Sequence, residues 1–145
     1  MTITYRSSHM GLCVTDLDRS LRFWCDGLGF ELDERFDLTD TLAPGLAEAL
    51  EVQAPVDLVS QMIVMGEWKF ELLYYATPKP QGAPSATRGQ LGFSHMSFWV
   101  DDVDAAAQRL VEYGGTILPT TRSNPGIPIQ FVADPDGVRV ELMGQ

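Results

Sequence analysis

One stretch of this chain occurs twice in related form. Residues 8–30 read SHMGLCVTDLDRSLRFWCDGLGF, and residues 94–116 read SHMSFWVDDVDAAAQRLVEYGGT. An internal repeat of this length indicates that one supersecondary unit has been duplicated, so the fold has to be built from two copies of it. The second residue of each copy is a histidine, His9 and His95, and the chain contains only 2 histidines.

Each copy is expected to begin as a strand and to continue as a helix. Met10–Val14 and Met96–Val100 are short apolar segments of the kind that forms strands. Capping residues follow, and each helix should stop at glycine, because glycine adopts the left-handed conformation that ends helices. In the first copy the capping residues are Thr15 and Asp18, the apolar helical positions are Leu17, Leu21, Trp24 and Leu28, and the glycines are Gly27 and Gly29. In the second copy the capping residue is Asp101 or Asp102, the apolar helical positions are Val103, Ala107 and Leu110, and the glycines are Gly114 and Gly115.

Three further strands are expected after each helix. In the first copy they cover residues 30–36, 58–65 and 69–75, and in the second copy residues 116–118, 129–133 and 139–143. MGEW and DPDG are turn sequences within these two sets. The predicted fold is therefore α+β, a single domain over residues 1–145 with two tandem βαβββ modules at residues 7–76 and 93–145 and a linker at residues 77–92.

The first module is longer than the second because it contains an insertion. Residues 37–55 read DLTDTLAPGLAEALEVQAP, and Leu46 and Leu50 with the alanines between them predict a short amphipathic helix within residues 42–50. Two interpretations stay open, a surface cover over the core and a lid over a pocket.

Composition excludes several classes of function. The chain has 20 acidic against 10 basic residues and a formal charge of −10, which disfavours nucleic acid. The same balance disfavours an anionic substrate unless a local basic patch overrides it. No apolar run is long enough to span a bilayer, and no secretory signal opens the sequence, so a soluble cytoplasmic protein is expected. Cys13 and Cys25 form no disulfide framework and are expected to be reduced thiols.

Four side chains that can bind a metal stand at matching places in the two modules. His9 and His95 begin the first strands, and Glu71 and Glu141 lie inside apolar runs of the last strands, KFELLYY and VRVELMG. Glutamate is seldom buried without a partner, and a divalent cation is such a partner. If the modules pair with pseudo-two-fold symmetry, two imidazoles and two carboxylates converge, a set that suits a first-row divalent ion with open positions.

Strand alternation predicts which other side chains share the face of these residues. The predicted pocket is mostly apolar and aromatic, which suits a small hydrophobic or aromatic oxygenated substrate. An alternative is that these side chains simply fill the interior of the sheets. The predicted pocket residues are Cys13, Leu73, Tyr75, Ser97, Trp99 and Met143, with Lys69 and Arg139 at strand entrances.

Several of these segments resemble the vicinal oxygen chelate superfamily, which includes glyoxalase I, methylmalonyl-CoA epimerase, extradiol dioxygenases and bleomycin-binding proteins. The segments are HMGLCVTDLDRSLRFWCDGLGF, KFELLYY, FSHMSFWVDDVD and DPDGVRVELM, and the resemblance covers nearly the whole chain. It implies tandem βαβββ modules around a metal-centred cavity, with His9, Glu71, His95 and Glu141 as ligands of one divalent ion, Ni, Co, Zn, Mn or Fe. His-Glu-His-Glu is the ligand set of glyoxalase I.

The resemblance implies a metal-dependent isomerase or lyase of glyoxalase or epimerase type. The substrate would chelate the ion through two neighbouring oxygens, and Glu141 or Glu71 would move a proton through an enolate-like intermediate. A homodimer is expected, with a small-molecule substrate and neither nucleic acid nor membrane as partner. An extradiol-type dioxygenase and a non-catalytic drug-binding protein remain alternatives.

The sequence departs from glyoxalase I at two positions that matter for its substrate. Glyoxalase I carries an arginine and an asparagine that hold glutathione where this chain carries Cys13 and Tyr75. Poor use of glutathione conjugates is therefore expected.

Overall fold

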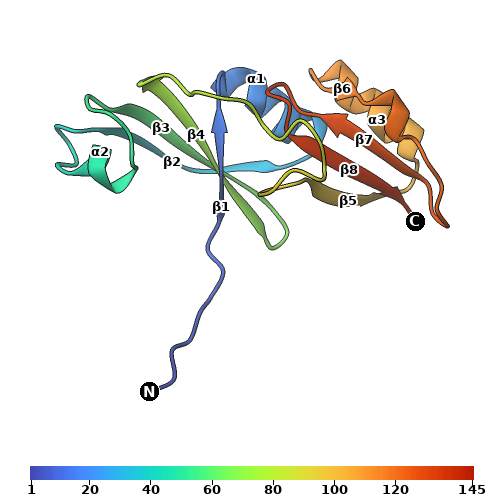
Figure 1. Ribbon diagram of the computed structural model, residues 1–145, viewed down its shortest axis with the longest axis horizontal. Coiled ribbons are helices and arrows are strands. Elements are labelled where there is room, and N and C mark those ends of the chain that lie inside the picture. Colours follow the sequence, from blue (N-terminus) through green and yellow to red (C-terminus); the bar gives the residue numbers. More distant parts are fainter. The chain divides into compact units, whose positions relative to one another are not determined.

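The computed structural model describes residues 1–145, and the chain divides into two compact units (Figure 1). Unit 1 consists of Met1–Leu17 with Phe30–Pro80, and unit 2 of Asp18–Gly29 with Gln81–Gln145. Each unit contains one four-stranded sheet. The expected α+β class with two repeated sheets is confirmed.

The sheet of unit 1 has the strand order β1-β4-β3-β2. β1 (Met10–Val14) runs parallel to β4 (Trp68–Thr77), while β4 pairs with β3 (Asp57–Met65) and β3 with β2 (Glu31–Thr39) in antiparallel fashion. β2 is longer than expected and shifts register between Leu32 and Arg35. The buried amide of Gln61 donates to the backbone oxygen of Asp33 at 3.2 Å there, so the irregular backbone keeps a hydrogen-bond partner.

The sheet of unit 2 repeats this topology with the order β5-β8-β7-β6. β5 (Met96–Val100) runs parallel to β8 (Arg139–Gly144), which pairs antiparallel with β7 (Ile129–Ala133). β6 (Thr116–Ile117) completes the sheet and is followed by the short helix η2 (Pro119–Thr121). The repeat in the sequence is therefore a repeat of strand order and direction, with β1 and β4 corresponding to β5 and β8.

The first helix departs from α-helical geometry. α1 (Leu17–Leu21) continues as η1 (Arg22–Gly27), in which the hydrogen bonds are those of a π-helix. Of the predicted apolar stripe only Trp24 is buried, and the three leucines are partly exposed. The buried face keeps the helical spacing i, i+3, i+4, i+7 but is offset from the predicted leucine stripe, which is wrong except at Trp24. The buried positions are Ser20, Phe23, Trp24 and Gly27.

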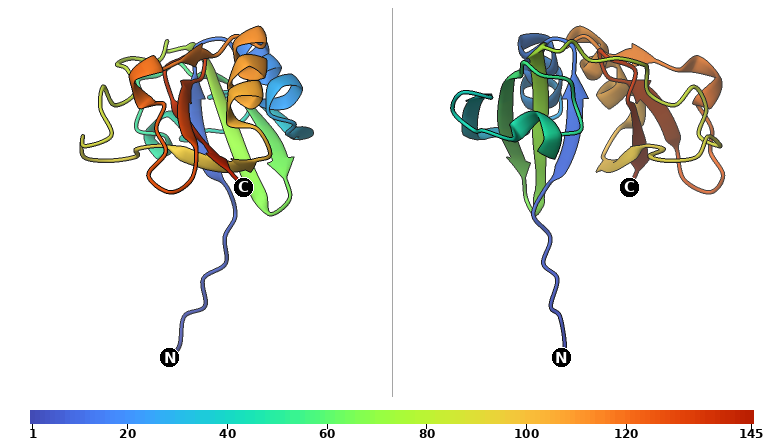
Figure 2. Two further views of the ribbon diagram at one scale, coloured as in Figure 1. Left: turned by 90° about the vertical axis from the view of Figure 1, so that its right-hand side faces the viewer. Right: turned by 60° about the vertical axis from the view of Figure 1, so that its left-hand side comes forward.

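The helix of the first module packs inside unit 2, beside α3 (Val103–Glu112) (Figure 2). Arg109 of α3 donates to the backbone oxygens of Asp26 at 2.6 Å and Gly27 at 3.0 Å. Arg22 of η1 donates in turn to the backbone oxygen of Glu112 at 2.9 Å. Each helix thus satisfies carbonyl groups at the C-terminal end of the other, which no intrahelical donor reaches.

Both helix ends confirm the predicted use of glycine. Gly29 and Gly114 have φ angles of 98° and 97°, in the left-handed region. Gly115 is required for a different reason, since a Cβ added there would lie 2.8 Å from the Phe23 ring and 2.9 Å from the backbone oxygen of Leu110. The expected N-cap of α3 is also present, because Asp102 accepts a 3.0 Å bond from the backbone N–H of Ala105. None of the helices combines the length and apolar character needed to cross a membrane.

The insertion of the first module forms α2 (Leu46–Ala49), shorter than the predicted helix. Ala47 packs in a core cluster with Val56, Leu58 and Tyr75. Leu58 and Tyr75 are register partners, and Tyr75 has the same strand parity as Glu71 on β4. The insertion therefore covers the face of the sheet that carries Glu71, as a cover over a core cluster.

A buried carboxylate ties η1 to the β7–β8 turn of unit 2. Asp134 of the DPDG turn accepts bonds from the indole N–H of Trp24 at 3.2 Å and from the backbone N–H groups of Asp136 at 2.9 Å and Val138 at 2.8 Å. Burial raises the pKa of Asp134 above its ordinary value, against the opposing effect of these hydrogen bonds.

We expect Asp134→Ala to lower the free energy of unfolding by about 3 kcal/mol, because it leaves several buried donors without an acceptor. Urea unfolding followed by circular dichroism measures the change. Asp104→Ala is the matched control, since its carboxylate pairs with Arg122 at 2.9 Å on the surface and should contribute far less. An equal loss in the two variants would contradict the role assigned to Asp134.

Candidate functional site

In unit 1, His9 and Glu71 lie side by side. His9 precedes β1, and Glu71 lies on β4 opposite Gly11, so parallel pairing brings the two side chains together. The Nε2 atom of His9 is 3.1 Å from Oε2 of Glu71. Ser60 of β3 donates to the other carboxylate oxygen, Oε1, at 2.5 Å, and the Ser8 hydroxyl lies 2.9 Å from Nδ1 of His9. Each oxygen of Glu71 therefore has its own partner.

In unit 2, His95, which precedes β5, and Glu141 of β8 form the corresponding pair. The Nε2 atom of His95 is 3.3 Å from Oε2 of Glu141, and the Ser94 hydroxyl lies 2.8 Å from Nδ1. Ser97 of β5 donates to Oε2 of Glu141 at 2.8 Å. Both partners of Glu141 thus share one oxygen, and Oε1 accepts no hydrogen bond.

The two carboxylates are held from opposite flanking strands. Ser97 is the register partner of Glu141, at the place that Gly11 occupies beside Glu71. Ser60 on β3 is the register partner of Leu73 on β4. The corresponding position on β7 is taken by Ile129, which has no hydroxyl. One hydroxyl therefore holds each carboxylate, from the inner strand in unit 1 and from the edge strand in unit 2.

The sequence interpretation missed three of these serines as functional residues. Ser8 and Ser94 carried a signal, because the tripeptide SHM begins both copies of the repeat. Ser60 carried none, since its contact with Glu71 depends on the register of β3 against β4.

The geometry of each pair fits the donor set of a first-row divalent ion. Two ligand atoms about 2.1 Å from one ion and at right angles to each other lie about 3 Å apart. The His–Glu separations of 3.1 Å and 3.3 Å match this spacing. A hydroxyl at Nδ1 fixes each imidazole so that Nε2 faces the carboxylate, as a second-shell partner does in metal sites. No third His, Cys, Asp or Glu joins either pair to make a larger cluster.

The predicted pocket residues lie on the faces that carry the two glutamates. Cys13 of β1 is exposed and is the register partner of Leu73 on β4. Tyr75 is buried in the cluster under α2, and this burial raises the pKa of its hydroxyl above the ordinary value. In unit 2, Trp99 is exposed, and Ser97 and Met143 are partly exposed.

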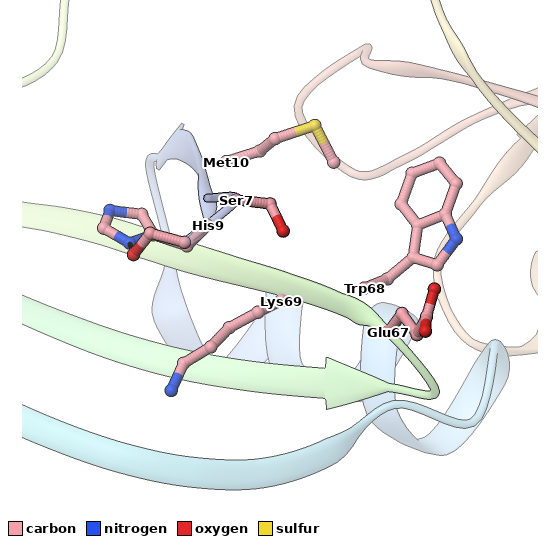
Figure 3. A pocket seen from close by; sticks show the side chains of 7 residues that line it. Ser7, His9, Met10, Glu67, Trp68 and Lys69 are labelled. Carbon is pink, nitrogen blue, oxygen red and sulfur yellow. Dashed lines mark hydrogen bonds between the residues drawn. The ribbon is translucent and has the colours of Figure 1, made fainter. Parts of the chain in front are cut away.

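A surface pocket of about 390 Å³ adjoins His9 in unit 1 (Figure 3). Figure 3 shows the imidazole of His9 and the side chain of Lys69 directed away from Met10 and Trp68. Lys69 donates to Asp33 at 2.7 Å, and this hydrogen bond raises the pKa of Lys69. The sequence interpretation did not predict that Met10 and Trp68 line a pocket. The pocket is lined by Ser7, Ser8, His9, Met10, Glu67, Trp68 and Lys69.

The sequence is similar to a family model and to several known proteins that carry related names. The model of the Glyoxalase/Bleomycin resistance protein/Dioxygenase superfamily matches residues 6–142. A probable lactoylglutathione lyase of Synechocystis sp. is 30% identical over 141 residues, covering 93% of this chain and 92% of the relative. A 2-epi-5-epi-valiolone epimerase of an Actinomyces species is 28% identical over 142 residues, covering 93% of this chain and 76% of the relative.

A solved structure shows the same fold. The crystal structure of a glyoxalase family protein from Bacillus cereus superposes with a TM-score of 0.80 at 20% identity, covering 99% of this chain and 95% of that chain. The family match spans both His–Glu pairs and both sheets. The chain therefore belongs to the glyoxalase, bleomycin resistance protein and dioxygenase superfamily.

Proposed function

We propose that the protein is a divalent-metal-dependent lyase or isomerase of glyoxalase or epimerase type, acting on a small substrate with two neighbouring oxygens. One observation carries the proposal: each unit presents a histidine and a glutamate at metal-ligand spacing on matching strands. The metal ligands would be His9, Glu71, His95 and Glu141. Relatives named lactoylglutathione lyase and epimerase support this reaction class.

The residues of the chain divide the work of such a reaction. A bound divalent ion supplies Lewis acidity toward the negative charge that develops on substrate oxygens. Ser60 and His9 each hold one oxygen of Glu71, which suits a carboxylate that stays in place. Oε1 of Glu141 accepts no hydrogen bond, so this oxygen can take a proton from the adjacent substrate carbon as a general base.

We also propose a homodimer that binds a small molecule in the cytoplasm, with no nucleic-acid or membrane partner. The excess of acidic over basic residues, 20 against 10, supports the absence of a nucleic-acid partner, and two cysteines outside any disulfide, Cys13 and Cys25, support the cytoplasmic setting. Light scattering after size-exclusion chromatography measures the assembly.

The experiment that tests the reaction class measures exchange of the substrate's α-hydrogen with deuterated solvent under nitrogen. A panel of 2-hydroxyketones, beginning with dihydroxyacetone, is incubated with metal-loaded protein and followed by NMR. Metal-dependent exchange without oxygen supports the lyase or isomerase. Oxygen consumption with catechols and no exchange would favour an extradiol dioxygenase, and tight binding of a cationic drug without turnover would favour a binding protein.

We expect Ser60→Ala and Ser97→Ala each to weaken the affinity for Ni²⁺ about 10-fold, because loss of an outer-shell hydrogen bond typically weakens metal binding by 10- to 100-fold. Calorimetric titration measures the affinity. Ser20→Ala is the matched control, since Ser20 carries a buried hydroxyl with no hydrogen bond in the helix of unit 2. Unchanged affinity in both test variants would show that these hydroxyls do not hold ligands.

We expect poor turnover of the glutathione hemithioacetal of methylglyoxal, with kcat/KM below about 10⁴ M⁻¹s⁻¹. Cys13 has no cationic group for a carboxylate, and Tyr75 is buried under α2. Formation of the thioester product, followed by its ultraviolet absorbance, measures this rate. A value above that limit would contradict the interpretation of both positions.

A further inference from the structure

A loop of unit 2 is fastened to the strand that carries Glu141. Arg139, two residues before Glu141 on β8, donates to the backbone oxygens of Ser85 and, at 2.6 Å, of Ala86. The loop also closes on itself, because the Ser85 hydroxyl donates to the backbone oxygen of Phe93 at 3.0 Å. The backbone N–H of Ala86 donates to the side-chain oxygen of Gln90 at 2.9 Å. These bonds hold the chain on either side of Arg88.

Arg88 lies over an aromatic ring beside the His95–Glu141 pair. Its guanidinium carbon is 4.3 Å from the centre of the Phe131 ring, at cation–π distance. Phe131 is buried and is the register partner of Glu141 on β7, so it lies on the same face of the sheet. The centre of its ring is 5.2 Å from that of His95. The Phe131 ring thus contacts both the guanidinium of Arg88 and the imidazole of His95, a candidate metal ligand.

Arg88 differs from every other arginine of unit 2 in its bonding. It is exposed, and its guanidinium donates no hydrogen bond, although the group carries five donors. The other five arginines all donate to oxygen atoms of unit 2: Arg19 to Asp136, Arg22 to Glu112, Arg109 to Asp26 and Gly27, Arg122 to Asp104, and Arg139 to Ser85 and Ala86.

We propose that Arg88 binds a carboxylate of the substrate, and this inference rests on the proposed function. A planar guanidinium with free donors matches the two oxygens of a carboxylate, and contact with the Phe131 ring holds this guanidinium near the His95–Glu141 pair. The substrate class becomes a small chelating compound that carries a carboxylate a few bonds away from its two neighbouring oxygens. Arg88 is then the local positive charge that overrides the acidic balance of the chain, at −10 overall.

The test uses chelating probes that differ only in the distal charge. Monohydroxamates of succinic, glutaric and adipic acid present two neighbouring oxygens and a free carboxylate, and their methyl esters lack the negative charge. Calorimetry measures the affinity of each probe for Ni²⁺-loaded wild type, Arg88→Gln, Arg88→Lys and Arg122→Gln. The Ni²⁺ content of each protein is measured before and after titration.

For at least one chain length we expect wild type and Arg122→Gln to bind the acid about 10-fold more tightly than the ester, since charge-assisted hydrogen bonds are stronger than neutral ones. This preference should disappear in Arg88→Gln, remain in part in Arg88→Lys, and shrink in high salt. Nickel content should be the same in all four proteins.

Equal affinity for acid and ester in wild type, or a preference that persists in Arg88→Gln, would overturn the role of Arg88 while the metal chemistry stands. Failure of every probe, acid and ester alike, to bind Ni²⁺-loaded protein would overturn the proposed function and the role of Arg88 together.

Discussion

Glu141→Gln is expected to slow metal-dependent exchange of the substrate's α-hydrogen by about 10²- to 10⁴-fold, the usual contribution of a general base. Glutamine keeps the size of the side chain and one oxygen donor, but it cannot take up the proton. Because Oε1 of Glu141 accepts no hydrogen bond, it is the carboxylate oxygen that is open to a substrate carbon. NMR in deuterated solvent under nitrogen, at saturating metal, measures the rate.

Glu71→Gln is the matched comparison for this experiment. Both oxygens of Glu71 are engaged, by Ser60 at 2.5 Å and by His9 at 3.1 Å, so its replacement should weaken metal affinity more than the exchange rate at saturating metal. The reverse pattern, with exchange lost in Glu71→Gln and retained in Glu141→Gln, would assign the base to the first module. If both variants retained the wild-type exchange rate, neither glutamate would be the base.

His9→Ala and His95→Ala are each expected to weaken Ni²⁺ affinity by more than about 100-fold, beyond the effect of removing an outer-shell partner. The two histidines lie in different units, so loss of a single wild-type site, one Ni²⁺ per chain, in both variants would indicate that both units contribute to the same ion. Calorimetric titration measures the affinity, and circular dichroism controls for folding. His9 and His95 are partly exposed, so neither variant should unfold. Loss of affinity in only one variant would confine the metal to one unit.

Much of the fold could be predicted because the repeat restricts it. The bounds of β5 and β7 agree with expectation, since short apolar segments there end at polar capping and turn residues. The DPDG turn and the glycines at 29 and 114 are also where local chemistry requires them. Parallel pairing of the first and last strand of each module then brings the histidine of each copy close to its glutamate.

Other features depend on contacts that local sequence does not encode. The buried face of the first helix carries Ser20, Phe23 and Trp24 in place of the predicted leucines, because packing within unit 2 decides which face is covered. The helix of the first module packs in unit 2 with the help of Arg22 and Arg109, each of which donates to backbone carbonyl groups of the other helix. Arg88 lies in a segment with no periodicity, so its position over a buried ring follows only from the bonds that hold its loop.

The most direct test of the central claim is X-ray absorption at the nickel edge of Ni²⁺-loaded protein, which counts the imidazole ligands of the ion. The claim that His9, Glu71, His95 and Glu141 bind one divalent ion predicts one nickel per chain with two imidazoles in wild type. After removal of one histidine, any nickel retained at high concentration should show a single imidazole. A wild-type spectrum with only oxygen ligands, or full nickel content with unchanged imidazole count in both His9→Ala and His95→Ala, would contradict the claim.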